Sequence, residues 1–208
     1  MQEIKIDRLI VGLDRCVRTL FGAHTAARPY PGASLQGGEA SGRKLAIGLM
    51  RVNHSGEVCA QALYQGQALF AREEHVRRAL LISADEECDH LAWTAQRLNE
   101  LGGRSSVFNP FWYAGAWTIG AGASLLGDAV SLGFLQETER QVVAHLEGHL
   151  LQLPPDDLRS KAVLQQMRDD EASHAVRARE LGAYELPVPL PLMMRLAAQV
   201  LTRFARFV

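Results

Sequence analysis

The sequence predicts an all-α protein, built on an antiparallel four-helix bundle with one long apolar crossover and additional amphipathic helices at both ends. Two observations carry this prediction. Long stretches between residues 44 and 181 repeat apolar side chains at steps of three and four, which is the period of a helix. Breaks rich in glycine and proline divide these stretches into two pairs of helices joined by a long connection. At 208 residues, the chain fits one domain of moderate size.

Composition and charge exclude several classes of protein. Hydrophobic residues make up 48% of the chain and charged residues 22%, which is typical of a globular protein. A net charge of -1 gives no basic bias toward nucleic acid. Cys16, Cys59 and Cys88 form no CxxC pair, which favours a reducing compartment, and the last two are expected to be small core residues. The first ten residues contain acids and no continuous apolar run, so no secretory signal is predicted.

Residues 1–42 are predicted to form a segment that precedes the bundle. From Asp7 to Phe21 the apolar residues follow a helical period opposite charged side chains, which predicts a short amphipathic helix. Residues 22–42 concentrate glycine, proline, alanine and serine without any period, so we expect a mobile loop there. The sequence assigns no role to either part.

Residues 43–183 are predicted to form the bundle itself. The first pair of helices covers residues 44–70 and 73–101 and ends at Gly102. The second pair covers residues 128–152 and, after a break at Pro154 and Pro155, continues to residue 181. Each pair should be antiparallel, because few residues separate its helices. A hairpin, a long crossover and a second hairpin are the topology of a ferritin-like bundle.

The crossover (residues 103–129) and the tail (residues 184–208) carry apolar surface. No charged residue occurs between Ser105 and Gly127, a length sufficient to span a membrane, but several glycines favour a buried or membrane-contacting helix instead. The tail predicts a last helix whose apolar stripe opposes basic residues, as in helices that lie on anionic lipid. The stripe is Leu192, Leu196, Val200 and Phe204, and the opposing residues are Arg195, Gln199, Arg203 and Arg206.

A repeated pattern of acids and histidines predicts a metal site. Glu-x-x-His occurs at Glu87–His90 and again at Glu171–His174, and this spacing places both side chains on one face of a helix. Glu57 precedes Glu87 by 30 residues, and Glu139 precedes Glu171 by 32 residues. Two hairpins with nearly the same pattern would bring four carboxylates and two imidazoles together in the middle of the bundle.

The residues around each motif decide between a metal site and a solvated helix face. A single Glu-x-x-His usually lies on a solvated face, but here apolar residues such as Leu80, Leu91 and Leu164 share the stripes of the two motifs. Buried carboxylates cannot all stay ionised without compensating cations. Carboxylates with imidazoles, and without thiolates, suit iron or manganese better than structural zinc. The expected chemistry is dioxygen activation.

Neighbouring polar residues leave alternatives open. Only Glu87 and Glu171 fit the motif spacing among the adjacent acids, while Asp89 and Asp170 either orient the imidazoles or, as we favour, are surface charges. Tyr64 either donates to the site, stacks on an aromatic substrate or fills the core. His145 is a weak candidate that would face one end of the bundle.

At these residues the sequence resembles the demethoxyubiquinone hydroxylase family of di-iron monooxygenases. The resemblance extends from about residue 43 to about residue 181, and its most specific stretch is Arg-Val-Asn-His-Ser-Gly-Glu, which ends at Glu57. Further matching stretches are Gln65-Gly-Gln67, Glu87-Cys-Asp-His90-Leu91, Glu139 with His145, and Arg168-Asp-Asp-Glu-Ala-Ser-His174. The resemblance implies two irons, with Glu87 and Glu171 bridging them. The terminal ligands it implies are Glu57 and His90 on one iron, and Glu139 and His174 on the other.

The resemblance also implies partners and a location. The substrate would be a polyprenyl methoxy-methyl-benzoquinol, hydroxylated on its ring with dioxygen. No nucleotide-binding glycine fingerprint occurs, so the electrons would come from an external donor or from the quinol. We expect a peripheral protein at the cytoplasmic face of the inner membrane, with homo-oligomerisation left open. The alternatives are a ferritin-like iron-storage protein and a metal-free scaffold that recruits partners to the membrane.

Overall fold

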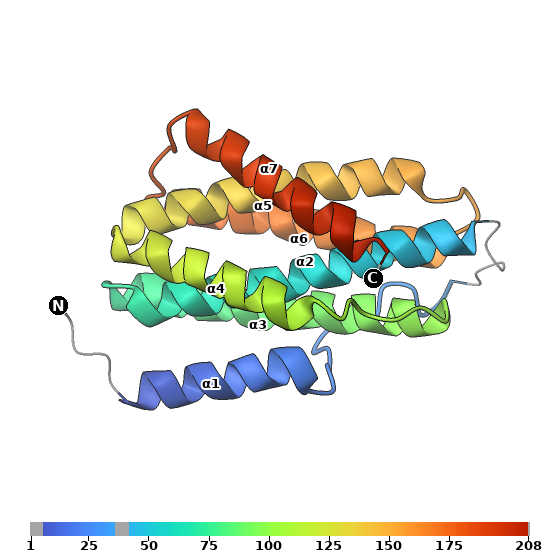
Figure 1. Cartoon of the computed structure of the whole chain (residues 1–208), viewed down its shortest axis with the longest axis horizontal. Helices are drawn as coiled ribbons and strands as arrows, with labels where there is room; N and C mark the ends of the chain where they lie inside the picture. The colour runs from blue at the N-terminus through green and yellow to red at the C-terminus, as the bar shows by residue number, and fades with distance from the viewer. Residues whose placement is uncertain (1–5, 36–41, 208) are drawn as a thin grey trace.

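The computed structural model describes residues 6–35 and 42–207, which form seven α-helices and no strand (Figure 1). The all-α class is therefore confirmed. The helices are α1 (Ile6–Phe21), α2 (Arg43–Phe70), α3 (Glu74–Glu100), α4 (Asn109–Leu125), α5 (Asp128–Gln152), α6 (Leu158–Glu180) and α7 (Pro189–Ala205).

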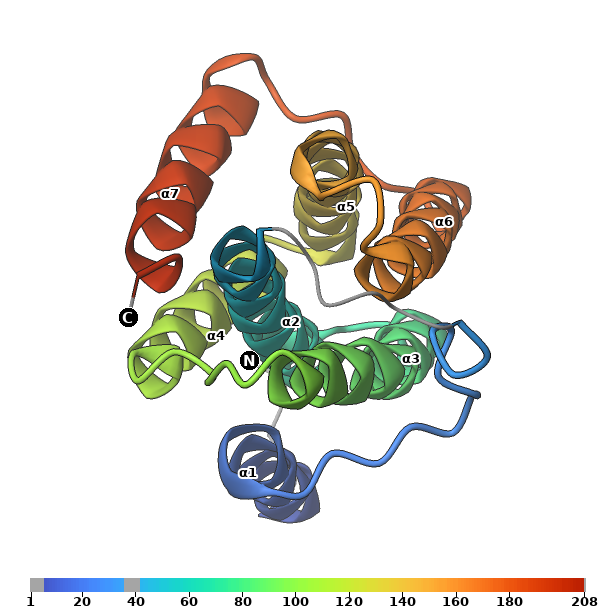
Figure 2. The ribbon, with the colours of Figure 1, turned by 90° about the vertical axis from the view of Figure 1, so that its right-hand side faces the viewer.

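Helices α2, α3, α5 and α6 form the four-helix bundle, seen end-on in Figure 2. The pairs α2/α3 and α5/α6 are hairpins, as the short breaks between them predict. Apolar residues from all four helices fill the two ends of the bundle, around Met50 and Leu164 at one end and around Leu80 and Leu132 at the other. The middle of the bundle is left for polar side chains, and it is there that the acids and histidines lie.

Local signals in the sequence explain where the helices end. Gly102 and Gly182 have φ values of 65° and 97°, a backbone conformation that side chains with a Cβ rarely adopt. At the start of α6, the Asp157 carboxylate accepts a hydrogen bond from the Ser160 backbone amide, which satisfies one of the free N–H groups of the first turn. The positions of these turns fix the register in which the hairpins present their acids.

Helix α4 lies within the predicted crossover and packs along α2 (Figure 1). Gly66 and Gly120 allow the close approach, because a Cβ at either position would collide with the backbone of the other helix. The outer face of α4 carries exposed residues such as Phe111 and Ile119. Among the described residues, no helix combines the length and the hydropathy needed to cross a membrane.

The segment before the bundle is more closely attached than its composition suggests. Ion pairs join α1 to α3, with Arg15 lying 2.8 Å from Asp85. Residues 22–35 are irregular, as predicted, but they pack on the bundle: Tyr30 donates a hydrogen bond to Glu100. The remainder of the predicted loop, residues 36–41, lies outside the described residues.

The cysteines differ in part from the prediction. Cys59 is partly buried against α4, in agreement with a small core residue. The same expectation is wrong for Cys88, which is exposed. Cys88 follows Glu87 directly, so it points about 100° away from the buried side of α3.

Candidate metal centre

Six side chains meet in the middle of the bundle, one or two from each of its four helices. All six are at most 3% exposed, and they are Glu57 on α2, Glu87 and His90 on α3, Glu139 on α5, and Glu171 and His174 on α6. They are the six residues that the repeated sequence pattern predicts as the metal site. Their helices place them there because each motif shares its stripe with buried apolar residues, such as Leu91 on α3 and Met167 on α6.

Two of the carboxylates lie between the two imidazoles. Glu87 lies 2.7 Å from Nδ1 of His90 and 2.9 Å from Nδ1 of His174. Glu171 lies 3.3 Å from Nδ1 of His90 and 3.2 Å from Nδ1 of His174. Both carboxylates therefore have one oxygen toward each half of the site, which is the arrangement that bridging ligands require.

The other two carboxylates each belong to one half. Glu57 lies 3.7 Å from Nδ1 of His90, and its Oε2 atom is buried without a hydrogen-bond partner. Glu139 lies in the opposite half and accepts a hydrogen bond of 2.7 Å from the Tyr64 hydroxyl. Burial, together with the charge of Glu139, raises the pKa of Tyr64 well above its usual value, so the hydroxyl keeps its proton and donates.

An acid precedes each motif, and it reaches the histidine of the other motif. Asp170 lies 2.9 Å from Nε2 of His90, and Glu86 lies 2.8 Å from Nε2 of His174. These contacts occupy the outer nitrogen of each imidazole and leave Nδ1 facing the four inner carboxylates. Such carboxylate partners fix the orientation and the tautomer of metal-binding histidines.

The pKa shifts of the buried carboxylates and imidazoles show that positive charge stabilises this cluster. Burial raises the pKa of Glu57 to about 8, and the charges of Glu87 and Glu171 act in the same direction. Burial opposes ionisation of Glu87 too, but His90 and His174 hold its pKa well below the usual range. Burial would lower the pKa of His174, but the hydrogen bonds and charges of Glu171 and Glu87 raise it to about 11. Protons on the imidazoles thus balance the carboxylates where metal ions would otherwise do so.

The donor set of the cluster is compatible with a metal site. Two overlapping groups each offer four ligand atoms within 4.8 Å of one another: Glu57, Glu87, His90 and Glu171, and Glu87, Glu139, Glu171 and His174. The buried Oε2 atom of Glu57 lacks a hydrogen-bond partner. A buried carboxylate oxygen without a partner is costly unless a cation or proton satisfies it. Oxygen-rich sites with imidazole suit iron or manganese.

Some site residues were ranked too low from the sequence. Asp170 contacts His90 and Asp89 is 3% exposed, so the preference for surface charge is wrong for both. Glu86 is a further site residue, and the signal for it in the sequence is the acid that directly precedes each Glu-x-x-His motif. Of the weak candidates, Tyr64 contacts the site, whereas His145 stacks beside His149 at 3.9 Å between ring centroids, away from the six residues.

Comparison with known proteins agrees with this geometry. The model of the family described as ubiquinone biosynthesis protein COQ7 matches residues 44–205. The chain belongs to the COQ7 family. The resemblance and the ferritin-like fold class predicted from the sequence are thereby confirmed, and the buried Glu and His cluster is compatible with a metal site in a protein of this family.

Individual members of the COQ7 family are similar to nearly the whole chain. The chain is 55% identical over 199 residues to the 3-demethoxyubiquinol 3-hydroxylase of Chromobacterium violaceum, which covers 95% of this chain and 97% of that protein. It is 53% identical over 205 residues to the protein of the same name from Nitrosospira multiformis, covering 98% and 99%. These alignments extend into the segment before residue 44, where the family match begins.

Proposed function

We propose that this protein is a di-iron 3-demethoxyubiquinol 3-hydroxylase of ubiquinone biosynthesis. The observation that carries the proposal is the buried cluster, in which two carboxylates are shared by two imidazoles. The names of its relatives supply the substrate. In the reaction, one oxygen atom of dioxygen replaces a ring hydrogen with a hydroxyl group. The other leaves as water, with two electrons and two protons supplied from outside the site.

The proposed ligands follow the contacts. Glu57 and His90 would hold one iron, Glu139 and His174 would hold the other, and Glu87 and Glu171 would serve both. This division is supported by the shared position of the two bridging carboxylates and by the separation of Glu57 from Glu139 into opposite halves. When bound, an iron pair would supply Lewis acidity and would pass the electrons of the external reductant to dioxygen.

The chain's own residues organise this chemistry. The six ligands are buried, so bulk water is kept from the reacting atoms and electrostatic interactions are strong there. Asp170 and Glu86 accept hydrogen bonds from the outer N–H groups of the imidazoles and hold each Nδ1 toward the metal. Tyr64 holds Glu139 in one orientation. His90, His174 and Glu139 are thus held in place before substrate arrives.

An apolar cavity beside the bundle suits the polyprenyl part of the substrate. It has a volume of about 610 Å³ and lies between α1, α2, α3 and α4, with Leu20, Leu69 and Trp117 in its wall. Pockets of this volume and character commonly hold small apolar ligands. Gln65, also in the wall, donates a hydrogen bond to Gln61, one turn from Glu57. We assign this cavity to the isoprenoid chain nearest the quinol ring.

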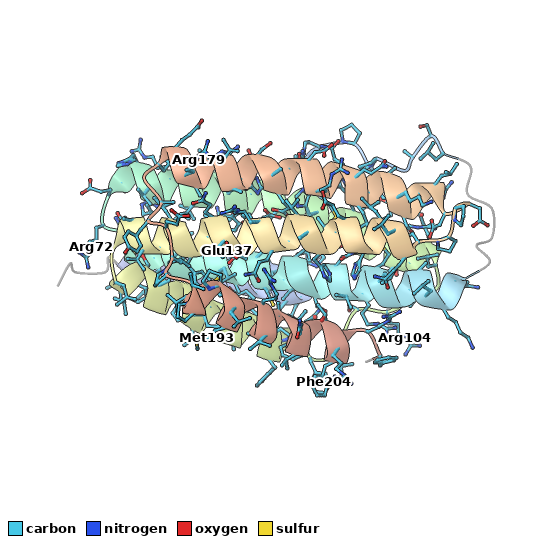
Figure 3. The ribbon with its side chains drawn as sticks, turned by 90° about the horizontal axis from the view of Figure 1, so that it is seen from above. Arg72, Arg104, Glu137, Arg179, Met193 and Phe204 are labelled. Carbon is cyan, nitrogen blue, oxygen red and sulfur yellow. The ribbon has the colours of Figure 1, made fainter. Side chains whose placement is uncertain are left out.

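Two helices offer a surface for peripheral membrane contact. Within α7, Ala205 is the buried residue, and the apolar stripe from Leu192 to Phe204 is exposed. Figure 3 shows Met193 and Phe204 on the side of α7 turned away from the bundle. The exposed apolar residues of α4 add to this surface. We place the protein at the cytoplasmic face of the inner membrane, where a polyprenyl quinol is found.

The remaining assignments complete the proposal. Residues 1–42, 43–183 and 184–208 act as an N-terminal segment, the di-iron bundle and a membrane-contacting tail. An external reductant supplies the electrons, and homo-oligomers are compatible with the apolar surfaces. Iron storage and a metal-free scaffold are not favoured, because the relatives are named as hydroxylases and the chain carries the buried cluster.

Complementation tests the function directly. In a bacterial strain that lacks the quinone hydroxylation step, the wild-type protein should restore ubiquinone, and Glu139→Ala should not. Glu137→Ala is the matched control, because Glu137 lies on the same helix but pairs with Gln141 instead of the site. Failure of the wild type to restore ubiquinone, or full rescue by Glu139→Ala, would contradict the proposal.

The membrane assignment has a separate test. A chain ending after Glu185 lacks α7 and should lose most of its binding to vesicles that contain anionic phospholipid, with the full chain as the reference. Equal binding of the two chains would show that the tail does not contribute to membrane binding.

A further inference from the structure

A side chain from outside the bundle reaches the partner of one imidazole. Arg28 belongs to the irregular segment between α1 and α2, and its guanidinium lies 2.8 Å from the Asp170 carboxylate. The same oxygen of Asp170 lies 2.9 Å from Nε2 of His90. A continuous path of polar contacts therefore runs from Arg28 through Asp170 to His90.

Arg28 is held by more than this one contact. Its Nε atom donates a hydrogen bond of 2.6 Å to Asp89, and the Ala27 backbone amide donates to the same carboxylate at 2.6 Å. The guanidinium also lies over the ring of Trp93, 4.8 Å from its centroid. Trp93 in turn packs against the His90 ring at 5.5 Å. The planar guanidinium is thus fixed between two carboxylates and an aromatic face.

The other half of the site has an equivalent arginine in a different place. Arg177 on α6 donates a hydrogen bond of 2.9 Å to Glu86, which lies 2.8 Å from Nε2 of His174. Each imidazole therefore has a carboxylate on its outer nitrogen and an arginine on that carboxylate. Arg177 lies within the residues that the family model matches, whereas Arg28 lies before them. The segment before the bundle thus supplies the arginine of the His90 half, whereas helix α6 supplies the arginine of the His174 half.

We propose that Arg28 is a positioning residue for the metal ion at His90, so that residues 22–35 complete the metal centre. This inference rests on the proposed metal ligands. Asp170 is partly exposed, with 18% of its side chain accessible, and Arg28 keeps its carboxylate turned inward to His90. Without the guanidinium, Asp170 keeps the hydrogen bond that Gln166 donates to its other oxygen, but the oxygen that faces His90 loses its cationic partner. The carboxylate then holds Nδ1 of the imidazole toward Glu57 and Glu87 less firmly.

The role of Arg28 is separable from the attachment of the segment itself. Tyr30 donates a hydrogen bond to Glu100, and Arg159 donates to the Leu35 carbonyl at 2.7 Å. Both contacts hold the segment without touching Asp170. Tyr30→Phe is therefore a matched control that loosens the segment and leaves the polar path to His90 intact.

Iron release measures the proposed role without relying on turnover. The full-length protein is loaded with ferrous iron without oxygen, and release to a coloured chelator is followed for the wild type, Arg28→Ala, Arg28→Lys, Asp170→Asn and Tyr30→Phe. Arg28→Ala should release its first iron about tenfold faster than the wild type, within the range seen when the partner of a metal-binding histidine is lost. Arg28→Lys should recover part of this loss, because lysine keeps the charge but cannot reach both carboxylates.

A double variant and a spectrum test whether Arg28 acts through Asp170. Arg28→Ala in an Asp170→Asn background should release iron no faster than Asp170→Asn alone, since both changes break the same path. Mössbauer spectra should change for one iron in Arg28→Ala and for the other in Arg177→Ala.

The measured release rates test the positioning role of Arg28 and the di-iron proposal separately. Release by Arg28→Ala at the wild-type rate, or release by Tyr30→Phe as fast as by Arg28→Ala, would overturn the positioning role while leaving the di-iron proposal standing. A wild-type protein that retains no iron would overturn both.

Discussion

The two hairpins of the bundle carry nearly the same pattern, yet they support their histidines differently. In both, a lone glutamate is followed by Glu-x-x-His, and the inner geometry is closely similar around His90 and His174. The outer supports differ, because one arginine comes from α6 and the other from the segment before the bundle. Helical periodicity thus sets the inner contacts of the site, and long-range packing sets the outer ones.

A second difference concerns the terminal carboxylates. Glu139 receives a hydrogen bond from Tyr64, whereas Oε2 of Glu57 is buried without one. The Glu57 half therefore depends more on a bound cation. Substitutions of a residue that contacts both imidazoles, or of a residue in only one half of the site, can distinguish the two halves.

The largest effect should follow from removing a group that both halves share. Glu87→Ala takes a carboxylate from both imidazoles at once, and we expect iron content near zero and hydroxylation reduced more than about a thousandfold, as for the loss of central catalytic groups. Metal analysis and a quinol hydroxylation assay measure this. A variant with full iron content would show that Glu87 does not bridge.

Removing a group of one half should affect one iron. Glu57→Ala should leave about one iron per chain bound and lower activity by at least about a hundredfold, the upper end of the cost of losing only the outer partner of a ligand. Glu139→Ala should do the same with the other iron, so the two variants should differ in their Mössbauer spectra. Identical spectra would contradict the division of ligands.

Metal affinity should rise with pH. In the metal-free site the pKa of His174 is about 11 and that of Glu57 about 8, so both hold protons at pH 7 and must lose them to bind a cation. Lower pH favours the proton and weakens binding, by about tenfold per pH unit for each proton displaced. Titration with manganous ion between about pH 6 and pH 8 tests this. An affinity independent of pH would contradict it, and Glu57→Gln should show a shallower slope.

The smallest effect is expected at Tyr64. Tyr64→Phe keeps the ring but removes the hydrogen bond to Glu139, and it should lower the free energy of unfolding of the metal-free protein by about 1 kcal/mol. Denaturant unfolding measures the change, with Tyr113→Phe as a control, since Tyr113 bonds Gln65 instead. An unchanged free energy of unfolding in Tyr64→Phe would show that Tyr64 only fills the core.

The difference between inner and outer contacts also explains what could be predicted from the sequence. Offsets of 30 and 32 residues in two helical hairpins bring Glu57 level with Glu87 and Glu139 level with Glu171, because the two glutamates of each hairpin lie equally far from its turn. The helical period then turns them to the buried side. The helix ends also depend on local residues: Gly102 and Gly182 adopt positive φ values after two helices, and Asp157 caps the start of α6.

The outer contacts could not be predicted from periodicity. Arg28 lies in a segment without any period, and it reaches Asp170 across 142 positions of the chain. Such a contact depends on how the segment folds back over α3, which no local pattern records. Asp170 and Glu86 were more accessible to prediction, because an acid precedes both motifs. Their reach across to the other helix, however, depends on the packing of α3 against α6.

The central claim is that two irons share Glu87 and Glu171 in one bundle. The most direct measurement is iron content per chain, after loading without oxygen and removal of free metal, combined with Mössbauer spectroscopy of the same sample. We predict about two irons per chain in two distinguishable sites, as in four-helix di-iron bundles generally. Fewer than about one iron per chain in the wild-type protein would contradict it.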